Sequence, residues 1–188
     1  MSRQLLLLIV VFCFGCSNAT EIVEESPPPA VSTDFARLPE LLAGVQPAGR
    51  TALYEGLPSQ FWEPQLRNQE LLQKETLDVH GHAVYDDPQT PSAGDAEQLT
   101  ALLAARDSYE PLSPAKGKKC GGFVAECCAE WTNGDKTTQI LICLECGEAM
   151  LFSPQLELHC NLSPEAAQRL KQLLSPYQQN SAAAKPKS

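Results

Sequence analysis

The sequence has few basic residues, and this shortage excludes one broad class of partner. Its 188 residues include 14 Lys and Arg against 23 Asp and Glu, for a formal net charge of −9. Proteins that bind nucleic acid usually present a basic stripe to the phosphates. We therefore expect no nucleic-acid partner, and we interpret the acidic excess as a contribution to solubility.

The common catalytic motifs are also missing from the sequence. It has no Gly-x-Ser-x-Gly elbow, no His-Glu-x-x-His pair and no phosphate-binding glycine loop. Carboxylate pairs such as Glu126/Glu130 and Asp86/Asp87 suit acid–base catalysis only in a cleft that separates their pKa values. We interpret these pairs as surface charge, assign no catalytic residue, and favour a protein that is not an enzyme.

The N-terminus has the pattern of an export signal over residues 1–15. Arg3 precedes an apolar segment, residues 5–14, which a small residue follows. The segment is shorter than the roughly 20 apolar residues that span a bilayer. This length disfavours an uncleaved membrane anchor and favours a leader that is removed.

The junction between the leader and the next residue resembles the lipid-attachment site of bacterial lipoproteins. Gly15 and Cys16 match that family, whereas Cys13 and Phe14 differ from its usual residues. The resemblance implies that Cys16 carries acyl chains and attaches the protein to the lipid bilayer, since two or more chains hold firmly. The alternative is ordinary secretion with cleavage after Ala19.

The same resemblance implies a location in the cell envelope. Ser17 follows the cysteine where many lipoproteins retained in the inner membrane carry an aspartate, so the outer membrane is favoured over the inner one. Residues 16–33 are acidic and rich in proline, which predicts a lipidated N-terminus followed by a disordered tether. We expect a single domain over residues 34–177 and a disordered tail over 178–188.

The hydrophobic pattern predicts an α+β domain with an antiparallel sheet of four or five strands and two helices packed on one face. The last helix is the clearest, with Ser163 as its cap, Pro164 in its first turn and Pro176 after its end. We expect helices at 34–44 and 92–106, a strand at 75–85, and a loop at 45–64 in which Tyr54, Phe61 and Trp62 anchor the packing.

A hairpin is expected between residues 123 and 146. Apolar and polar residues alternate before Asn133-Gly134, a tight turn, and the return strand is apolar in its middle, which is typical of a central strand. A loop of two or four residues at 133–136 would pair residues of the two strands whose numbers sum to 267 or 269. The expected shared face carries Phe123, Ala125, Cys127, Ala129 and Trp131 with Thr138, Ile140, Ile142, Leu144 and Cys146.

This register brings Cys120 close to Cys146. If Gly147 is a bulge in one long strand and the chain turns again at Ser153-Pro154, four cysteines meet in one patch: Cys120, Cys143, Cys146 and Cys160. An exported chain meets an oxidising compartment. We therefore expect at least one disulfide within this set, with its connectivity undetermined.

Two alternatives use the same cysteines. Cys143-Leu-Glu-Cys146-Gly147 resembles the knuckle of zinc ribbons, in which case Cys120 and Cys160 would supply the other two ligands. An exported thiol-redox protein would need a helix directly after the pair, and the residues here look like strand. A c-type haem is excluded because Gly147 replaces the required histidine. Cys127 and Cys128 are interpreted as ordinary strand residues.

Asp78, His80 and His82 form a second candidate metal site, since their spacing places them on one face of a strand. A solvated sheet face is the simpler interpretation. From residue 53 onward the chain also resembles a group of uncharacterised bacterial exported proteins, through Tyr54–Pro58, Cys120–Phe123 and Ile142–Gly147. That group implies no known activity.

The sequence thus predicts a membrane-anchored cell-envelope lipoprotein with a non-catalytic binding or structural role. Its expected partners are the lipid bilayer, through acylated Cys16, and an envelope protein, and no cofactor is expected. The alternatives are a small zinc-binding protein that uses the Cys143–Cys146 knuckle and an exported thiol-redox protein.

Overall fold

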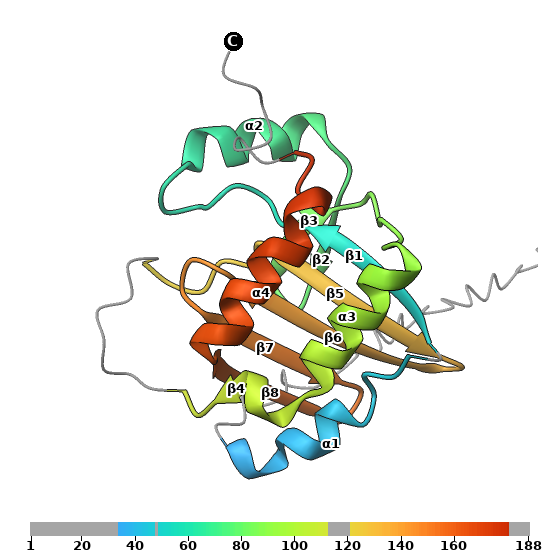
Figure 1. The fold of residues 1–188 in the computed structure, drawn as a ribbon. Helices are drawn as coiled ribbons and strands as arrows, with labels where there is room; N and C mark the ends of the chain where they lie inside the picture. The colour runs from blue at the N-terminus through green and yellow to red at the C-terminus, as the bar shows by residue number, and fades with distance from the viewer. Residues whose placement is uncertain (1–33, 48, 113–120, 181–188) are drawn as a thin grey trace, which may run out of the picture.

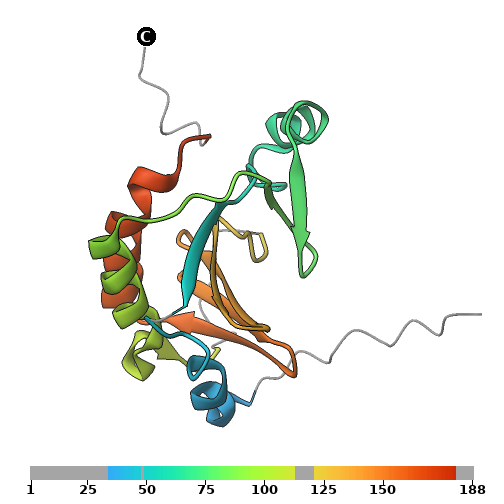
Figure 2. The ribbon, with the colours of Figure 1, turned by 90° about the vertical axis from the view of Figure 1, so that its right-hand side faces the viewer.

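The structure is a computed structural model that describes residues 34–47, 49–112 and 121–180. Figure 1 shows an α+β fold in which two helices lie across one face of an antiparallel sheet, and Figure 2 shows a separate hairpin on the opposite face. Within these residues, the sheet has six strands in the order β1-β5-β6-β7-β8-β4, and the hairpin is β2-β3. The predicted fold class is confirmed, with six strands in place of four or five.

The elements follow one another in this order: η1 Phe35–Arg37, α1 Leu38–Leu42, β1 Arg50–Glu55, α2 Pro64–Gln73, β2 Thr76–Val79, β3 His82–Tyr85, α3 Ala93–Ala104, η2 Arg106–Ser108, β4 Tyr109–Glu110, β5 Cys127–Asn133, β6 Lys136–Cys143, β7 Glu148–Ser153, β8 Leu156–Leu162, α4 Pro164–Leu174 and η3 Ser175–Tyr177.

The two long helices form as their sequence signals predict. The Ser92 side chain accepts from the Asp95 amide at the start of α3, and Ser163 accepts from the Ala166 amide at the start of α4. Such caps satisfy backbone N–H groups that have no partner inside the helix. Both helices bury leucines on the sheet, among them Leu103 and Leu170, in one continuous core.

The strand β1 was not predicted, because residues 45–64 were expected to form a loop. Arg50–Glu55 pairs antiparallel with β5, from Arg50 opposite Thr132 to Glu55 opposite Cys127. The segment forms a strand because it can bury Ala52 and Leu53 at the sheet edge. Its tertiary contacts therefore outweigh the glycine and proline residues on either side of it.

The central hairpin is confirmed with the register sum of 269. Cys127 lies opposite Ile142 and Asn133 opposite Lys136. Cys127, Ala129 and Trp131 share the helix-side core with Ile140 and Ile142.

The predicted face is wrong for Phe123 and Ala125. These two residues belong to the cluster on the opposite face, with Cys128 and Leu141. The difference arises because the chain bends at Glu126, directly before β5 begins.

The bulge expected at Gly147 is a full reversal of the chain. β6 ends at Cys143, residues 144–147 form a turn, and β7 begins at Glu148. Gly147 has a φ of 64°, a backbone conformation that glycine adopts without strain. The turn expected at Ser153-Pro154 is confirmed, since Ser153 pairs with Leu156.

The strand expected at 75–85 is also a hairpin. His80 and Gly81 have φ values of 53° and 83°, which fit a two-residue turn with positive φ at both positions. Asp78 accepts from the Gly81 amide at 2.9 Å. Asp78, His80 and His82 therefore do not lie on one strand face, and this predicted metal-site geometry is wrong.

The predicted packing anchors before α2 are only partly correct. Tyr54 packs against the hairpin-side cluster. Trp62 is 68% exposed and Phe61 is 44% exposed. None of the α2 residues is fully buried.

Residues 178–180, expected to belong to a disordered tail, lie against β1. The Asn180 amide and side chain both donate to Oε2 of Glu55, at 2.7 and 3.0 Å. The Gln179 side chain donates to Gln89 at 2.9 Å. The predicted leader, Cys16, the tether and the end of the tail lie outside the described residues.

Candidate functional site

A pocket of about 450 Å³ lies where β1 ends, beside the turn after β6 and the last part of α4. Figure 1 shows these segments at the same end of the sheet as α2. The charged side chains that line the pocket are Glu55, Glu63, Glu126, Glu145 and Lys171. Most of its lining is apolar, with Trp62 and Leu57 among the contributing residues.

The local backbone brings two carboxylates to this pocket. Gly56 follows the last residue of β1, and its amide donates to the Glu126 carbonyl at 2.9 Å. A Cβ atom at this position would overlap the carbonyl oxygen of Ala125. Glycine is therefore required for the close approach that places Glu55 and Glu126 along one wall.

Glu55 is the most deeply buried charged residue of the pocket, with 4% of its surface exposed. Its Oε2 atom accepts the two hydrogen bonds from Asn180. Its Oε1 atom is buried and has no hydrogen-bond partner within the described residues. Because buried polar atoms nearly always have a hydrogen-bond partner, we expect a donor from outside the described residues, such as a ligand or water, to bind this oxygen.

Tyr85 supplies a second buried polar atom to the wall. Tyr85 is 3% exposed, and its hydroxyl lies beside the Glu70 carboxylate, to which its proton can be donated, without a hydrogen bond of strict geometry to any described residue. Burial, followed by the nearby carboxylates of Glu70 and Glu55, raises the pKa of this phenol. The hydroxyl is therefore neutral at physiological pH and can accept or donate one hydrogen bond.

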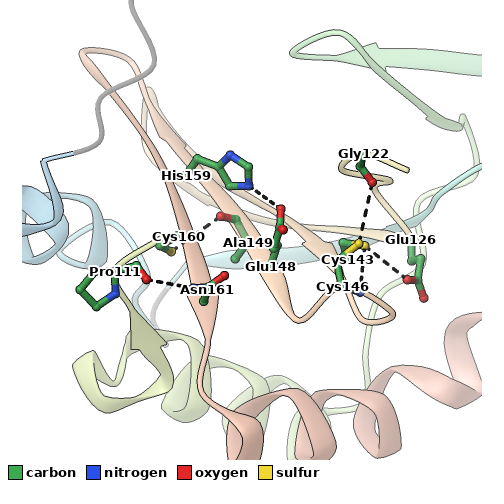
Figure 3. Close-up of polar contacts among 10 residues, drawn as sticks. All are labelled: Pro111, Gly122, Glu126, Cys143, Cys146, Glu148, Ala149, His159, Cys160 and Asn161. Carbon is green, nitrogen blue, oxygen red and sulfur yellow. Dashed lines mark hydrogen bonds and ion pairs between the residues drawn. The ribbon is translucent and has the colours of Figure 1, made fainter. Parts of the chain in front are cut away.

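Glu126 and Cys143 meet on the neighbouring wall, as Figure 3 shows. The Glu145 amide donates to Oε1 of Glu126 at 2.8 Å, and the Cys143 thiol donates to the same oxygen at 3.8 Å. Burial raises the pKa of the Glu126 carboxyl, although the hydrogen bond from Glu145 opposes that effect.

Cys143 and Cys146 differ in their chemical state. Cys143 is a free thiol whose pKa burial raises to about 11, so the thiolate is scarce at neutral pH. Cys146 is disulfide-bonded, and its sulfur lies 3.8 Å from the Gly122 carbonyl oxygen. The other four described cysteines, Cys127, Cys128, Cys143 and Cys160, are free thiols.

The predicted patch of four cysteines does not form, because Cys160 lies on the other face of the sheet. The chain reversal at Gly147 pairs Cys160 with Ala149, and the Cys160 thiol donates to the Ala149 carbonyl at 3.7 Å. Cys160 belongs to the helix-side core, whereas Figure 3 shows Cys143 and Cys146 together near Glu126. Cys120 lies outside the described residues.

All three histidines lie on the hairpin side of the sheet. His80 stacks on Phe152 with ring centroids 3.7 Å apart, and the Phe123 ring makes edge contacts with both His82 and His159. His159 also pairs with Glu148 at 2.7 Å. Within residues 34–47, 49–112 and 121–180, no three His, Cys, Asp or Glu side chains are placed to hold a metal ion.

The sequence did not indicate Glu55 or Tyr85 as site residues. Trp62 was expected to anchor the packing, whereas it lies exposed at the pocket. The contact between Glu55 and Asn180 joins residues 125 positions apart, and no local sequence pattern predicts it. The one available signal was a glutamate among the apolar residues of a short segment, at the position where a strand ends.

Comparisons with known proteins add no relative. No protein-family model, curated protein or solved structure matches this chain. None of the helices in the described part of the chain combines the length and apolar character needed to cross a membrane. We therefore infer function from the pocket and its residues.

Proposed function

We propose that this protein is a non-catalytic binding protein of the cell envelope, held at the bilayer by acylated Cys16, and that the pocket at the end of β1 is its ligand site. The unpartnered Oε1 atom of Glu55, buried in the pocket wall, carries the proposal. Ligand sites are typically apolar clefts of about 300–1,000 Å³ with a few convergent polar groups. The pocket has this size and this character.

Binding is favoured over chemistry by the state of the reactive groups. The Cys143 thiol is buried and protonated at neutral pH, which makes it a poor nucleophile. The Glu126 carboxylate is already engaged by the Glu145 amide. The pocket therefore offers fixed polar groups, which suit recognition.

The state of Cys146 supports the envelope location. Disulfides persist in oxidising compartments and are rare in the cytosol. Cys120 remains the candidate partner from the predicted cysteine set, because Cys143 and Cys160 are free thiols. The bridge between Cys120 and Cys146 is part of the proposal, and peptide mapping without reduction would identify it.

The binding proposal is tested by nuclear magnetic resonance titration with a fragment library that includes cationic, neutral and anionic members. We expect fragments that shift the backbone amides of Gly56, Val124 and Leu144, which line the pocket. Leu144→Trp, which fills the pocket, should abolish these shifts, whereas Leu71→Trp on the exposed side of α2 should leave them unchanged. A library in which no fragment of any charge perturbs these amides would overturn the binding proposal.

The anchoring proposal is tested by labelling cells with radioactive palmitate. The wild-type protein should incorporate the label and Cys16→Ala should not, because the thioether needs that sulfur. Cys13→Ala is the matched control and should be labelled like the wild type. Equal labelling of the wild type and Cys16→Ala would contradict acylation at Cys16.

A further inference from the structure

The charges around the pocket are strongly unequal. Four carboxylates line it, those of Glu55, Glu63, Glu126 and Glu145, against the single ammonium group of Lys171. Partly buried charges interact more strongly than exposed ones, because water screens them less. The pocket therefore repels anions and favours a ligand with positive charge.

The unpartnered atoms of the wall specify the kind of cation. Oε1 of Glu55 is a carboxylate oxygen that accepts hydrogen bonds, and the oxygen of the Tyr85 hydroxyl, whose proton is directed to Glu70, can accept one more. A ligand that satisfies both must bring N–H donors with its charge. A primary ammonium group has three such donors, whereas a quaternary ammonium group has none.

Trp62 adds an aromatic surface to the pocket. Trp62 is 68% exposed, although it lines the cavity. An ammonium group is attracted to the face of an indole ring by the ring's quadrupole. The exposed ring can therefore cover a second positive charge or the alkyl chain between two charges.

The spread of the carboxylates distinguishes an extended cation from a metal ion. No three acidic, histidine or cysteine side chains in the described residues converge on a point that a metal ion could occupy. The charges instead line a cavity of about 450 Å³. A chain with separated ammonium groups matches this distribution better than a point charge does.

From these observations we infer that the pocket binds a small aliphatic di- or polyamine, with one primary ammonium group donating to Oε1 of Glu55. This inference rests on the proposed binding function and names its ligand class. The second ammonium group lies toward Trp62 and the carboxylates at the pocket opening.

The test is calorimetric titration of the full chain with three compounds of matched length: 1,4-diaminobutane, 1,4-butanediol and succinate. About 150 mM salt suppresses unspecific attraction of a cation to an acidic protein, since it shortens the Debye length to about 8 Å. We expect the diamine to saturate one site and the diol and the diacid to show no saturable binding.

Matched variants locate the interaction. Glu55→Gln should weaken diamine binding about tenfold or more, because it removes the charged acceptor. Glu97→Gln, on the exposed side of α3, changes the net charge equally and should bind like the wild type. Trp62→Ala replaces an exposed side chain, so it should fold normally and weaken binding severalfold.

The possible results separate this inference from the binding proposal. Equal weakening in Glu55→Gln and Glu97→Gln would overturn the inference, because the attraction would then be unspecific. Pocket binding by the diol or the diacid, without diamine binding, would overturn the ligand class and leave the binding proposal standing. If none of the three compounds and no fragment of the library binds the pocket, both the binding proposal and the ligand class are rejected.

Discussion

At the scale of single residues, His82 links the fold to pH. The imidazole lies half-buried against Phe123, and burial lowers its pKa below the ordinary value of 6.5. Asp78 opposes this shift, whereas Arg67, His159 and His80 add to it. Below 6.5 the unfolded chain therefore takes up a proton more readily than the folded protein does, and the free energy of unfolding falls as pH falls.

We predict that the wild type loses stability between about pH 7.5 and about pH 5.5 and that His82→Gln loses less over this range. Urea unfolding at the two pH values measures the difference. Lys74→Gln, at an exposed position directly before the same hairpin, removes a charge but no imidazole and serves as the control. Identical losses in the wild type and His82→Gln would contradict the assignment to His82.

The buried indole of Trp131 depends on one hydrogen bond. Its Nε1 atom donates to the Thr100 hydroxyl at 3.1 Å, and both residues are buried in the helix-side layer. Thr100→Val keeps the shape of the side chain and leaves the N–H without its acceptor.

We predict that Thr100→Val lowers the free energy of unfolding by about 1–3 kcal/mol, as expected for a buried donor left unpaired. Thr137→Val, at a half-buried position of β6, is the matched control and should change stability by less than about 0.5 kcal/mol. Chemical denaturation measures both values. A loss no larger in Thr100→Val than in the control would show that the bond contributes little.

At the scale of elements, two glycines that have room for a side chain should change the stability of the protein in opposite directions when each is replaced by alanine. Gly81 lies in the β2–β3 turn with a φ of 83°, whereas Gly94 lies in the first turn of α3. A Cβ at either position would meet no atom within 4 Å. The backbone conformation alone therefore decides the effect.

We predict that Gly81→Ala destabilises the protein by about 1 kcal/mol, because alanine adopts a positive φ only with strain. Gly94→Ala should stabilise it by about 0.4–1 kcal/mol, since alanine restricts the unfolded chain at a helical position. Thermal unfolding of both variants gives the comparison. Changes of the same sign would contradict this account of the turn.

The elements also show which parts of the fold the sequence could predict. α3 and α4 carry capping serines and leucines at helical spacing, so their signals are local. The pairing of β5 with β6 followed from the turn at Asn133-Gly134 and the alternation before it, which left the register sums of 267 and 269 both open. β1 was missed because its stability comes from pairing with β5, far along the chain. The turn at Gly147 was missed because a glycine there fits a bulge as well as a reversal.

The candidate site was less predictable than the fold. Cys143 and Cys146 were singled out, but their expected convergence with Cys160 depended on the wrong path at Gly147. Glu126 was interpreted as surface charge, whereas it lines the pocket and is partly buried. Glu55 lines the pocket only because β1 forms and Asn180 packs against its end. Such a site has no local spacing, and only the tertiary structure brings its residues together.

At the scale of the whole molecule, stability should be unevenly distributed. β6 lies in the middle of the sheet, and Ile140, Leu141 and Ile142 are completely buried. α2 has no fully buried residue and exposes Leu72 to 88%. Segments with few buried contacts open locally at low free energy, whereas central strands open only with the whole fold.

We predict that amide hydrogen exchange is slowest in β6 and fastest, among the helices of eight residues or more, in α2. Exchange measured by mass spectrometry with peptide resolution tests this order, and α3 and α4 serve as references within the same molecule. Protection of α2 equal to that of β6 would contradict the prediction.

The most direct measurement of the central claim is a crystal structure of the protein grown with 1,4-diaminobutane. The account predicts density for the diamine in the pocket, with one nitrogen within hydrogen-bonding distance of Oε1 of Glu55 and the chain passing Trp62. A structure in which that oxygen contacts only water, while the diamine is absent from the pocket or bound elsewhere, would contradict it.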